Sequence, residues 1–482
     1  MWNTMSILRR LKYRWNTEGG YGEVLYLAFP LIISTGTWSV QHFVDRMFLT
    51  WYSPEAIAAA MPAGMLSFTI SCLFIGTASY VGTFVAQYYG AGHYHRCGPA
   101  LWQGIYLSLI GGAVQLAFIP AAAFIFHLIG HAPEIAECER VYFIILCGGG
   151  IPAIAASAMA AFFSGLGKTL PVMWINIVQT IVNLFLDWIF VFGRWGIPEM
   201  GIAGAGIATV SAYVLSIALY FFLLFKGRYS HRYHSLIGWR FEKALFIRLV
   251  RFGFPSGVQF FIEIAGFTCF IVLIGRLGTD ALAASNIAFN INTLAFMPML
   301  GTGIAVSVLT GQHIGEHKPH LAERTAYSAF HLTFLYMGLI AVLYVVCPDL
   351  FIKPFAVHSD PVRFGSIREL TVVLLRFVAF YSLFDTLNII FSSAVKGAGD
   401  TRFVMTAELS ISMAVMVVPS YIAIVLLSKG IYTGWVFTTA HISILGIVFY
   451  IRFLGGKWKS MRVIEERVAP LPPSFPEAPA AD

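Results

Sequence analysis

Charged side chains are scarce in this chain, and Asp, Glu, Lys and Arg together make up 11% of its 482 residues. Soluble domains carry about 25% charged residues, so a chain of this composition cannot cover itself with a solvated surface. Its 58% hydrophobic residues and its mean hydropathy of +0.75 point the same way. We therefore expect an integral membrane protein.

Enzyme motifs are missing as well. The six cysteines lack CxxC or metal-type spacing, so we expect them to pack as small apolar residues. GLGKT at 165–169 resembles part of a phosphate-binding loop, but the first glycine of that loop would fall at Phe162. HLIGH at 127–131 lacks a third metal ligand and a catalytic Glu. We therefore expect no enzyme, no catalytic residue, no cofactor and no nucleic-acid partner, and any pumping must use an ion gradient or a partner.

Long apolar runs are abundant, and a bilayer is crossed by about 20 such residues in a helix. Both termini lie on one side because the predicted count, twelve, is even. With that side placed inside, 22 of the 31 Lys and Arg are cytoplasmic and six are on the opposite side, as the positive-inside rule requires. We expect a multi-pass protein of the bacterial inner membrane with both termini cytoplasmic. The predicted spans are 24–51, 57–88, 99–130, 139–164, 170–193, 202–226, 244–276, 281–312, 322–352, 364–396, 403–428 and 431–454.

The chain also contains an internal duplication. An offset of 225 aligns Pro30 with Pro255 and holds without a gap for about 65 residues, and GLGKT at 165–169 later aligns with GAGDT at 397–401. Each repeat therefore holds six helices. Further pairs at the offset of 225 are Gly76 with Gly301, Gln87 with Gln312, Gly90 with Gly315 and His95 with His320.

This duplication predicts the fold class, which is an all-α integral membrane protein with two six-helix bundles. Because six is even, both bundles enter from the same side and are related by a pseudo-two-fold axis along the membrane normal. We expect a monomer in the lipid bilayer. The predicted division is a cytoplasmic N-terminal segment at 1–23, an N-lobe at 24–226, a cytoplasmic linker at 227–243, a C-lobe at 244–455 and a cytoplasmic tail at 456–482 whose Pro/Ala-rich end is disordered.

Acidic residues inside the predicted helices call for an explanation, because a charge at mid-membrane costs about 2.5–3.5 kcal/mol. Such residues either perform a function or hydrogen-bond helices together. The candidates are Asp45, Asp187, Glu263, Asp385 and Glu408.

Carboxamides accompany the two acids of the first repeat. Asn183 and Asn176 lie four and eleven residues before Asp187, which places all three on one helix face, and Gln41 lies four residues before Asp45. Hard oxygen ligands of this kind suit a proton or a Na⁺ ion. The sequence therefore predicts a cation site in the N-lobe.

Prolines interrupt several predicted helices. Pro30 lies fifteen residues before Asp45, and the backbone groups that it frees would let the first helix bend. The alternative is a static kink. Pro255 is its equivalent in the second repeat.

Several motifs in order now make the chain resemble the multidrug and toxin extrusion (MATE) family, in its NorM-like branch. They are FPLIIS, VDRMFL and AIAAA in the first two helices, QYYGAG after the second, NLFLDWIFVFGRWGIPEMGIAGAGIAT at 183–209, GFPSGVQFFIEIAGF in the seventh helix and FDTLNIIFSSAVKGAGDT in the tenth. The resemblance covers about residues 20–455. It implies an antiporter that exports organic cations or amphipathic drugs and toxins in exchange for Na⁺ or H⁺.

The resemblance also implies site residues. Asp45, Asn183, Asp187 and Thr209 fall on the family's N-lobe cation site, whereas Gln41 departs from a tyrosine that some members place there.

In the C-lobe, Glu263 and Asp385 match the acids of Na⁺-coupled members. Since the chain holds both carboxylate sets, the coupling ion, Na⁺ or H⁺, has a candidate site in each lobe.

Three other classes of function compete with this interpretation. A lipid-linked precursor flippase of the related superfamily would need basic residues deep in its cavity, whereas the clear intramembrane charges here are acidic. A receptor or scaffold would not need two acidic lobes. A membrane enzyme would need a nucleophile–base pair or a metal site.

Overall fold

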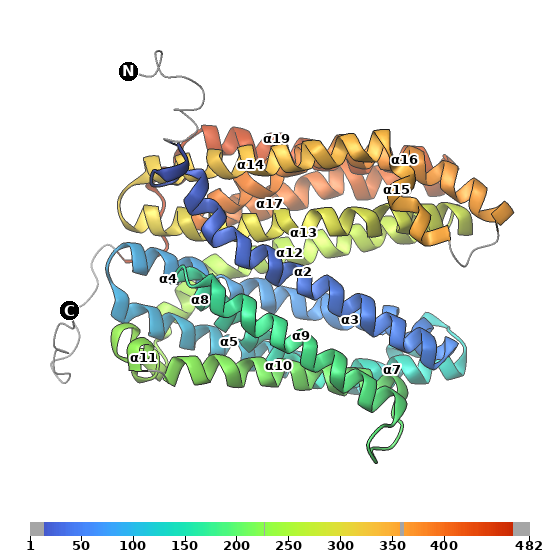
Figure 1. Ribbon diagram of the computed structural model, residues 1–482, viewed down its shortest axis with the longest axis horizontal. Coiled ribbons are helices and arrows are strands. Elements are labelled where there is room, and N and C mark those ends of the chain that lie inside the picture. Colours follow the sequence, from blue (N-terminus) through green and yellow to red (C-terminus); the bar gives the residue numbers. More distant parts are fainter. Residues whose placement is uncertain (1–13, 226, 357–360, 466–482) are drawn as a thin grey trace.

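The computed structural model describes residues 14–225, 227–356 and 361–465, and every described element is helical (Figure 1). Most of the predicted N-terminal segment and the predicted disordered end of the tail lie outside these residues. Eleven described helical segments are long and apolar enough to cross a membrane, and the bent pair α7–α8 brings the number to twelve. The predicted twelve spans and the all-α fold agree with this architecture.

The N-terminal bundle contains the helices before the linker. They are α2 (Tyr21–Tyr52), α3 (Pro54–Ser79), α4 (Val81–Gly90), α5 (Cys97–Phe118), α6 (Ala122–Ile129), α7 (Pro133–Gly148), α8 (Gly150–Gly165), α9 (Thr169–Phe192) and α10 (Gly201–Phe225). The linker forms the short helix α11 (Gly227–Tyr233).

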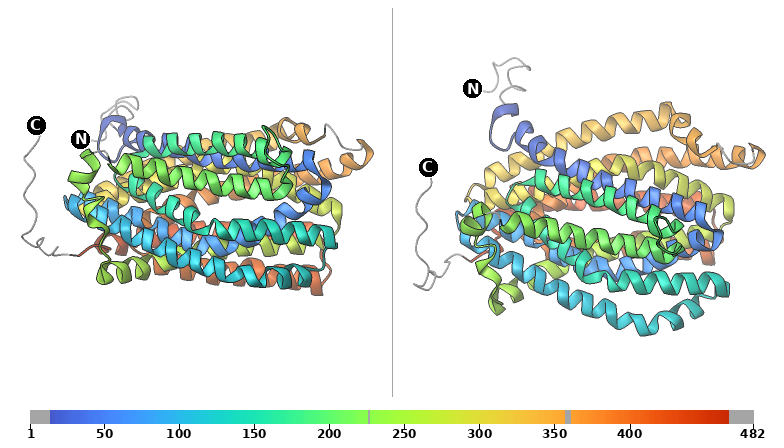
Figure 2. Two further views of the ribbon diagram at one scale, coloured as in Figure 1. Left: turned by 90° about the horizontal axis from the view of Figure 1, so that it is seen from below. Right: turned by 60° about the horizontal axis from the view of Figure 1, so that its bottom comes forward.

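The C-terminal bundle follows the linker. Its helices are α12 (Lys243–Gly275), α13 (Thr279–Gly315), α14 (Pro319–Val346), α15 (Pro348–Ile352), α16 (Pro361–Ala398), α17 (Thr401–Ile411), α18 (Val418–Tyr421) and α19 (Ile431–Leu454). Two π-helical segments, at 412–417 and 422–426, flank α18. In Figures 1 and 2 the helices of both bundles run along the long axis, and α2 and α13 lie at the boundary between the bundles.

Local sequence explains two departures from the predicted spans. The predicted span at 322–352 is too long, because α14 ends at Val346. The residue before a proline avoids the α conformation, and Cys347, which precedes Pro348, has left it. The predicted span at 139–164 is bent by 47° between α7 and α8, where Gly149 and nearby Pro152 weaken the helix.

Contacts between the bundles follow the internal repeat. A Cβ on Gly76 of α3 would lie 2.8 Å from the Cα of Gly257 in α12, and a Cβ on Gly301 of α13 would lie 2.7 Å from the Cα of Ile32 in α2. The offset of 225 converts Gly76 into Gly301 and Ile32 into Gly257. One contact is therefore the pseudo-symmetric copy of the other, as two bundles related by a two-fold axis require.

The same symmetry operates at one end of the molecule, which we call the basic end and define by the connections at 91–96, 166–168, 316–318 and 399–400 together with residues 455–465. There the Nε2 of Gln87 donates to the carbonyl of Gly397 at 3.0 Å, and the Nε2 of Gln312 donates to the carbonyl of Gly165 at 2.9 Å. Both pairs are related by the repeat. We call these two interactions the glutamine clamp, and they hold the bundles together at the basic end.

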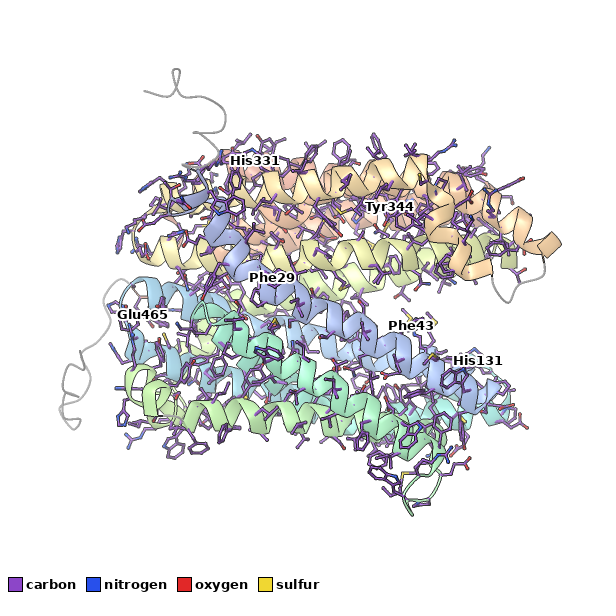
Figure 3. The ribbon with its side chains drawn as sticks, viewed as in Figure 1. Phe29, Phe43, His131, His331, Tyr344 and Glu465 are labelled. Carbon is purple, nitrogen blue, oxygen red and sulfur yellow. The ribbon has the colours of Figure 1, made fainter. Side chains whose placement is uncertain are left out.

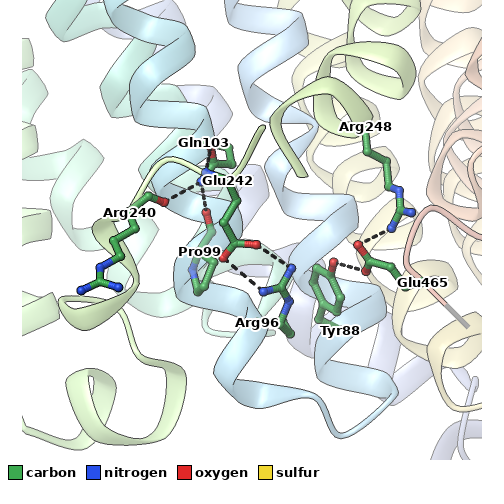
Figure 4. A network of polar contacts seen from close by, with 8 residues as sticks. All are labelled: Tyr88, Arg96, Pro99, Gln103, Arg240, Glu242, Arg248 and Glu465. Atoms are coloured by element: carbon green, nitrogen blue, oxygen red, sulfur yellow. Dashed lines mark hydrogen bonds and ion pairs between the residues drawn. The ribbon is translucent and has the colours of Figure 1, made fainter. Parts of the chain in front are cut away.

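Residues 457–465 add contacts at this end (Figure 4). Glu465 forms an ion pair with Arg248 of α12 and accepts a hydrogen bond of 2.6 Å from the Tyr88 hydroxyl of α4. Beside them, Arg96 and Glu242 form an ion pair of 2.9 Å that ties the start of α5 to the start of α12. The last described residues thus bridge both bundles.

Candidate functional site

The first candidate site lies between α2 and α9, which pack side by side. Asp45 of α2 and Asp187 of α9 face each other closely enough to share a hydrogen bond when one carboxyl carries a proton. Asn183 lies one helical turn before Asp187 and shares its face. Asp187 is 1% exposed and Asn183 is fully buried. The structure therefore brings three of the predicted N-lobe residues together.

These buried groups are not satisfied by their surroundings. Among the described residues, no hydrogen-bond partner reaches Oδ1 of Asp45, either carboxylate oxygen of Asp187, or either polar side-chain atom of Asn183. Arg46 of α2 interacts electrostatically with Asp45, whereas the described neighbours of Asp187 include no such positive group. Burying an ionised carboxylate without a counter-charge is strongly unfavourable. A proton or a monovalent cation between the two carboxyl groups would remove that cost, and the carboxylate and carboxamide oxygens are ligands of the right type for Na⁺.

Two tyrosines complete the surroundings of this pair, and sequence reasoning missed both. Tyr142 of α7 interacts electrostatically with both Asp45 and Asp187, and Tyr213 of α10 interacts with Asp45. Phenolic oxygens add neutral ligands or hydrogen-bond donors. Thr209 lies four residues before Tyr213, and Glu139 lies three residues before Tyr142. This spacing does not show that the phenols reach the carboxyl pair, which depends on the packing of α7 and α10.

The other polar residues that the sequence indicated in the N-lobe do not bond to the carboxyl pair in the contacts described below. Gln41 is buried on α2, one turn before Asp45. The Thr209 hydroxyl donates to the carbonyl of Ala205 in its own helix at 3.0 Å. Asn176 bonds instead to the Ser34 hydroxyl of α2, so it ties α9 to α2 away from the carboxyl pair. His42 packs edge-on against Trp38, with ring centroids 4.9 Å apart.

The second candidate site lies in the C-terminal bundle. Asp385 of α16 is buried, and its Oδ1 accepts a hydrogen bond of 3.0 Å from Asn388. Glu263 of α12 is exposed and interacts electrostatically with Asp385 and with Cys72 of α3 in the other bundle. The structure therefore brings the two predicted C-lobe acids into one region that faces the boundary between the bundles.

A lysine joins this second region. The ammonium of Lys396 donates to Oε1 of Gln259 at 3.1 Å, and Nε2 of Gln259 lies 3.5 Å from Oε2 of Glu263. Lys396 is a basic residue in the last turn of α16, and nothing in its sequence spacing indicates that the ammonium points into the bundle. Glu408, left open as a candidate in the sequence, is 3% exposed and lies 3.7 Å from Nε2 of His441.

Aromatic side chains bridge the bundles near Glu263. The Phe68 ring of α3 packs edge-on against Phe260 of α12 at 5.9 Å and also contacts Trp38 of α2 at 5.9 Å. We call these three residues the aromatic bridge. Figure 3 shows Phe43, 70% exposed, further along α2 at the same boundary. Such rings suit flat cationic molecules.

Neither of the two prolines predicted to bend a helix breaks it in this structure. Pro30 and Pro255 are both buried, and α2 and α12 each continue through them as one helix.

Among the described residues, no group of three or more His, Cys, Asp or Glu side chains is placed to hold a metal ion. A Na⁺ ion would therefore have to combine carboxylates with neutral oxygens.

Comparison with known proteins places this geometry in a wider context. The MatE family model matches residues 30–189 and again residues 255–422, one match in each repeat. A protein of Thermotoga maritima described as a probable multidrug resistance protein NorM is 22% identical over 93% of this chain and 96% of its own length. The multidrug resistance protein NorM of Burkholderia vietnamiensis is 27% identical over 79% of this chain and 82% of its own.

Solved structures share the fold. One, described as the outward-facing conformation of a multidrug resistance MATE family transporter of the MOP superfamily, superposes with a TM-score of 0.82. It is 19% identical and covers 95% of this chain and 100% of its own. Because the sequence identity is this low, the superposition shows a shared arrangement of helices and nothing more specific.

Proposed function

Because the chain belongs to the MatE family of membrane transporters, we propose that it is a cation-coupled antiporter that exports organic cations or amphipathic drugs and toxins. Na⁺ or H⁺ would drive export by alternating access between the two bundles. Membership of a transporter family agrees with the expectation that the chain is not an enzyme. The observation that carries the proposal is the carboxyl pair Asp45–Asp187, in which Asp187 is buried and has no described hydrogen-bond donor for either oxygen when both groups are ionised.

The N-terminal pair is the proposed coupling site. A cation that enters from outside compensates one negative charge of the pair Asp45–Asp187, and its departure leaves two carboxylates that repel each other across the α2–α9 contact. Occupied and empty states therefore favour different packing of α2. A ligand drives a conformational change only when it binds the two states differently, and this geometry supports such a difference.

The aromatic bridge is the proposed substrate contact. Trp38, Phe68 and Phe260 come from both bundles, so a substrate stacked on them would touch both. Exposed Glu263 lies three residues after Phe260 on α12 and provides a negative charge beside the rings. This combination supports an organic cation as cargo, which agrees with the multidrug resistance named for the relatives.

The glutamine clamp supports alternating access. Gln87 and Gln312 close the basic end by bonding across the boundary. We infer that this end is cytoplasmic because its connections belong to the side to which the positive-inside rule assigns 22 of the 31 Lys and Arg. In this conformation the substrate path would be open on the outer side. Uptake from the cytoplasm would require the clamp to break.

Inverted membrane vesicles provide the test. We expect vesicles with the wild-type protein to accumulate ethidium when Na⁺ or acid is placed in the lumen. Asp45→Asn and Asp187→Asn should each abolish this accumulation while the protein still inserts. Glu134→Gln, which neutralises an exposed carboxylate of α7, is the matched control and should transport normally. Normal export by both aspartate variants would overturn the proposed coupling site.

A further inference from the structure

Lys396 has an unusual position for a lysine near a helix end. It lies two residues before the end of α16, where lysine side chains normally extend toward the aqueous interface. Its ammonium instead turns into the bundle and donates to Gln259 of α12, a residue that is 8% exposed. A charge held inside the membrane needs a reason, which its neighbours provide.

The ammonium is bonded to Gln259 and lies within electrostatic range of two carboxyl groups on different helices. It interacts electrostatically with Glu263 of α12 and with Glu408 of α17. Gln259 connects it to the first of these, because the amide oxygen of Gln259 faces the ammonium and its NH₂ group faces Glu263. Glu408 of α17 faces α19, where Nε2 of His441 lies 3.7 Å from its Oε1. Lys396 thus has one carboxylate partner at the boundary between the bundles and a second one inside the C-terminal bundle.

The region contains more carboxyl groups than ammonium groups among the described residues, three against one. Glu408 interacts electrostatically with Glu263, with Asp385 and with Lys396. Lys396 is the one Lys or Arg among these described neighbours of Glu408. A second cation can therefore be accommodated, provided that it takes Glu263 while the ammonium turns to Glu408.

The repeat shows that this lysine is not part of the common scaffold. At the offset of 232 that aligns GAGDT with GLGKT, Lys396 corresponds to Ser164. The Ser164 hydroxyl donates to the carbonyl of Ala160 in its own helix at 2.8 Å. The N-terminal carboxyl pair therefore has no tethered ammonium at this position, whereas the C-terminal acids do.

We propose that Lys396 is a tethered competitor of the cationic substrate for Glu263. This inference rests on the proposed function and deepens it. When an organic cation stacks on the aromatic bridge and pairs with Glu263, the Lys396 ammonium moves to Glu408. When the ammonium returns to Glu263, it displaces the cation and assists its release. Lys396 and Glu408 are positioning residues in this scheme, because they act on the substrate through Glu263.

Binding of radiolabelled tetraphenylphosphonium, a monovalent organic cation, to the purified full-length protein tests the proposal. Lys396→Met removes the competitor, so the dissociation constant should fall by roughly tenfold, within the range usual for coupled binding events. Glu408→Gln removes the alternative partner, so the ammonium stays at Glu263 and the dissociation constant should rise several-fold. Lys396→Arg keeps the charge and should bind like the wild type.

Controls separate this inference from folding defects and from the proposed function. Lys168→Met changes the same charge at the basic end of the other bundle and should leave binding unchanged. Lys396→Gln, which can still bond to Gln259, replaces Lys396→Met if the latter does not fold. Equal or weaker binding by Lys396→Met, or by Lys396→Gln in its place, with normal wild-type binding, would overturn the tethered competitor alone. A wild-type protein that neither binds nor exports the probe would overturn the proposed function and this inference with it.

Discussion

Asp187 combines near-complete burial with two carboxylate oxygens that no described donor reaches. A carboxylate that only held helices together would be expected to accept hydrogen bonds, since buried polar groups are usually paired. Asn176 illustrates that structural role, because it bonds to Ser34 across the α2–α9 contact. The contrast between two polar residues on one helix is the reason to assign Asp187 to cation binding.

Thermal stability distinguishes these two roles. If Asp187 faces Asp45 to bind a cation, Asp187→Asn removes a repulsive carboxyl and should melt at or above the wild-type temperature in Na⁺-free buffer at alkaline pH. Asn176→Leu, the matched variant, removes a bond between helices and should melt lower. A differential scanning measurement in detergent gives both values. A clear loss of stability in Asp187→Asn would indicate a structural carboxylate.

The aromatic bridge leads to a prediction about affinity. Trp38→Ala should raise the KM for ethidium about fivefold, because a cation–π contact contributes on the order of 1 kcal/mol. Trp174→Ala removes a tryptophan that is 60% exposed on α9 and should leave the KM unchanged. Initial rates of uptake into inverted vesicles provide the comparison. An equal effect of both substitutions on the KM would show that the aromatic bridge does not contact the substrate.

At the scale of helices, α2 and the segment around α18 show how proline acts in this fold. Pro30 lies inside α2 and leaves the carbonyl one turn earlier without its helical donor, yet the helix stays continuous. Pro419 lies in α18 between two π-helical segments, a local geometry that is common at functional sites. Both helical segments therefore combine a proline with a candidate acidic residue elsewhere along their length, Asp45 in α2 and Glu408 in α17.

The bending role of Pro30 is testable by substitution. Pro30→Ala restores a backbone donor to α2, so it should stabilise the protein by about 1 kcal/mol and lower the turnover number of export. Pro62→Ala makes the same change inside α3 and provides the control. Transport assays and melting curves on both variants check this. Full turnover in Pro30→Ala would favour a static kink.

Helices were the most predictable elements, and side-chain partners were the least. The apolar runs located nearly every span, because hydropathy acts along the chain and needs no tertiary information. The bend at Gly149 and the early end of α14 depended on local Gly and Pro effects that a hydropathy run does not register. Asp45, Asn183 and Asp187 could be grouped from helical spacing and family motifs, whereas Tyr142 and Lys396 reach their partners only through the packing of other helices.

At the scale of the whole molecule, duplication gives the protein two similar bundles with different interiors. The paired contacts of Gly76 with Gly257 and of Gly301 with Ile32 preserve the symmetry at the boundary. The charged interiors have diverged, since the Asp45–Asp187 pair in one bundle lacks a lysine and the acids of the other surround Lys396. This divergence agrees with the two proposals above, in which the N-terminal bundle binds the coupling ion and Lys396 of the C-terminal bundle competes with the substrate for Glu263.

Breaking the glutamine clamp should open the basic end. Gln87→Leu combined with Gln312→Leu removes both hydrogen bonds of the glutamine clamp, so backbone hydrogen exchange should accelerate at 83–90 and 308–315. Gln115→Leu is the control, because Gln115 is fully buried and its amide donates to the Ser71 hydroxyl within the N-terminal bundle. Mass spectrometry of the exchanged protein follows both regions. Unchanged exchange in the double variant would mean that other contacts close this end.

The most direct test of the account is export by the purified wild-type protein in liposomes under one imposed gradient at a time. We predict that a Na⁺ gradient or a pH gradient, directed against substrate movement, drives ethidium across the membrane, and that dissipating that gradient stops it. A response to Na⁺ or to pH identifies the coupling ion. Ethidium movement that ignores both gradients, in correctly inserted protein, would contradict cation-coupled export and favour a lipid-linked precursor as the cargo.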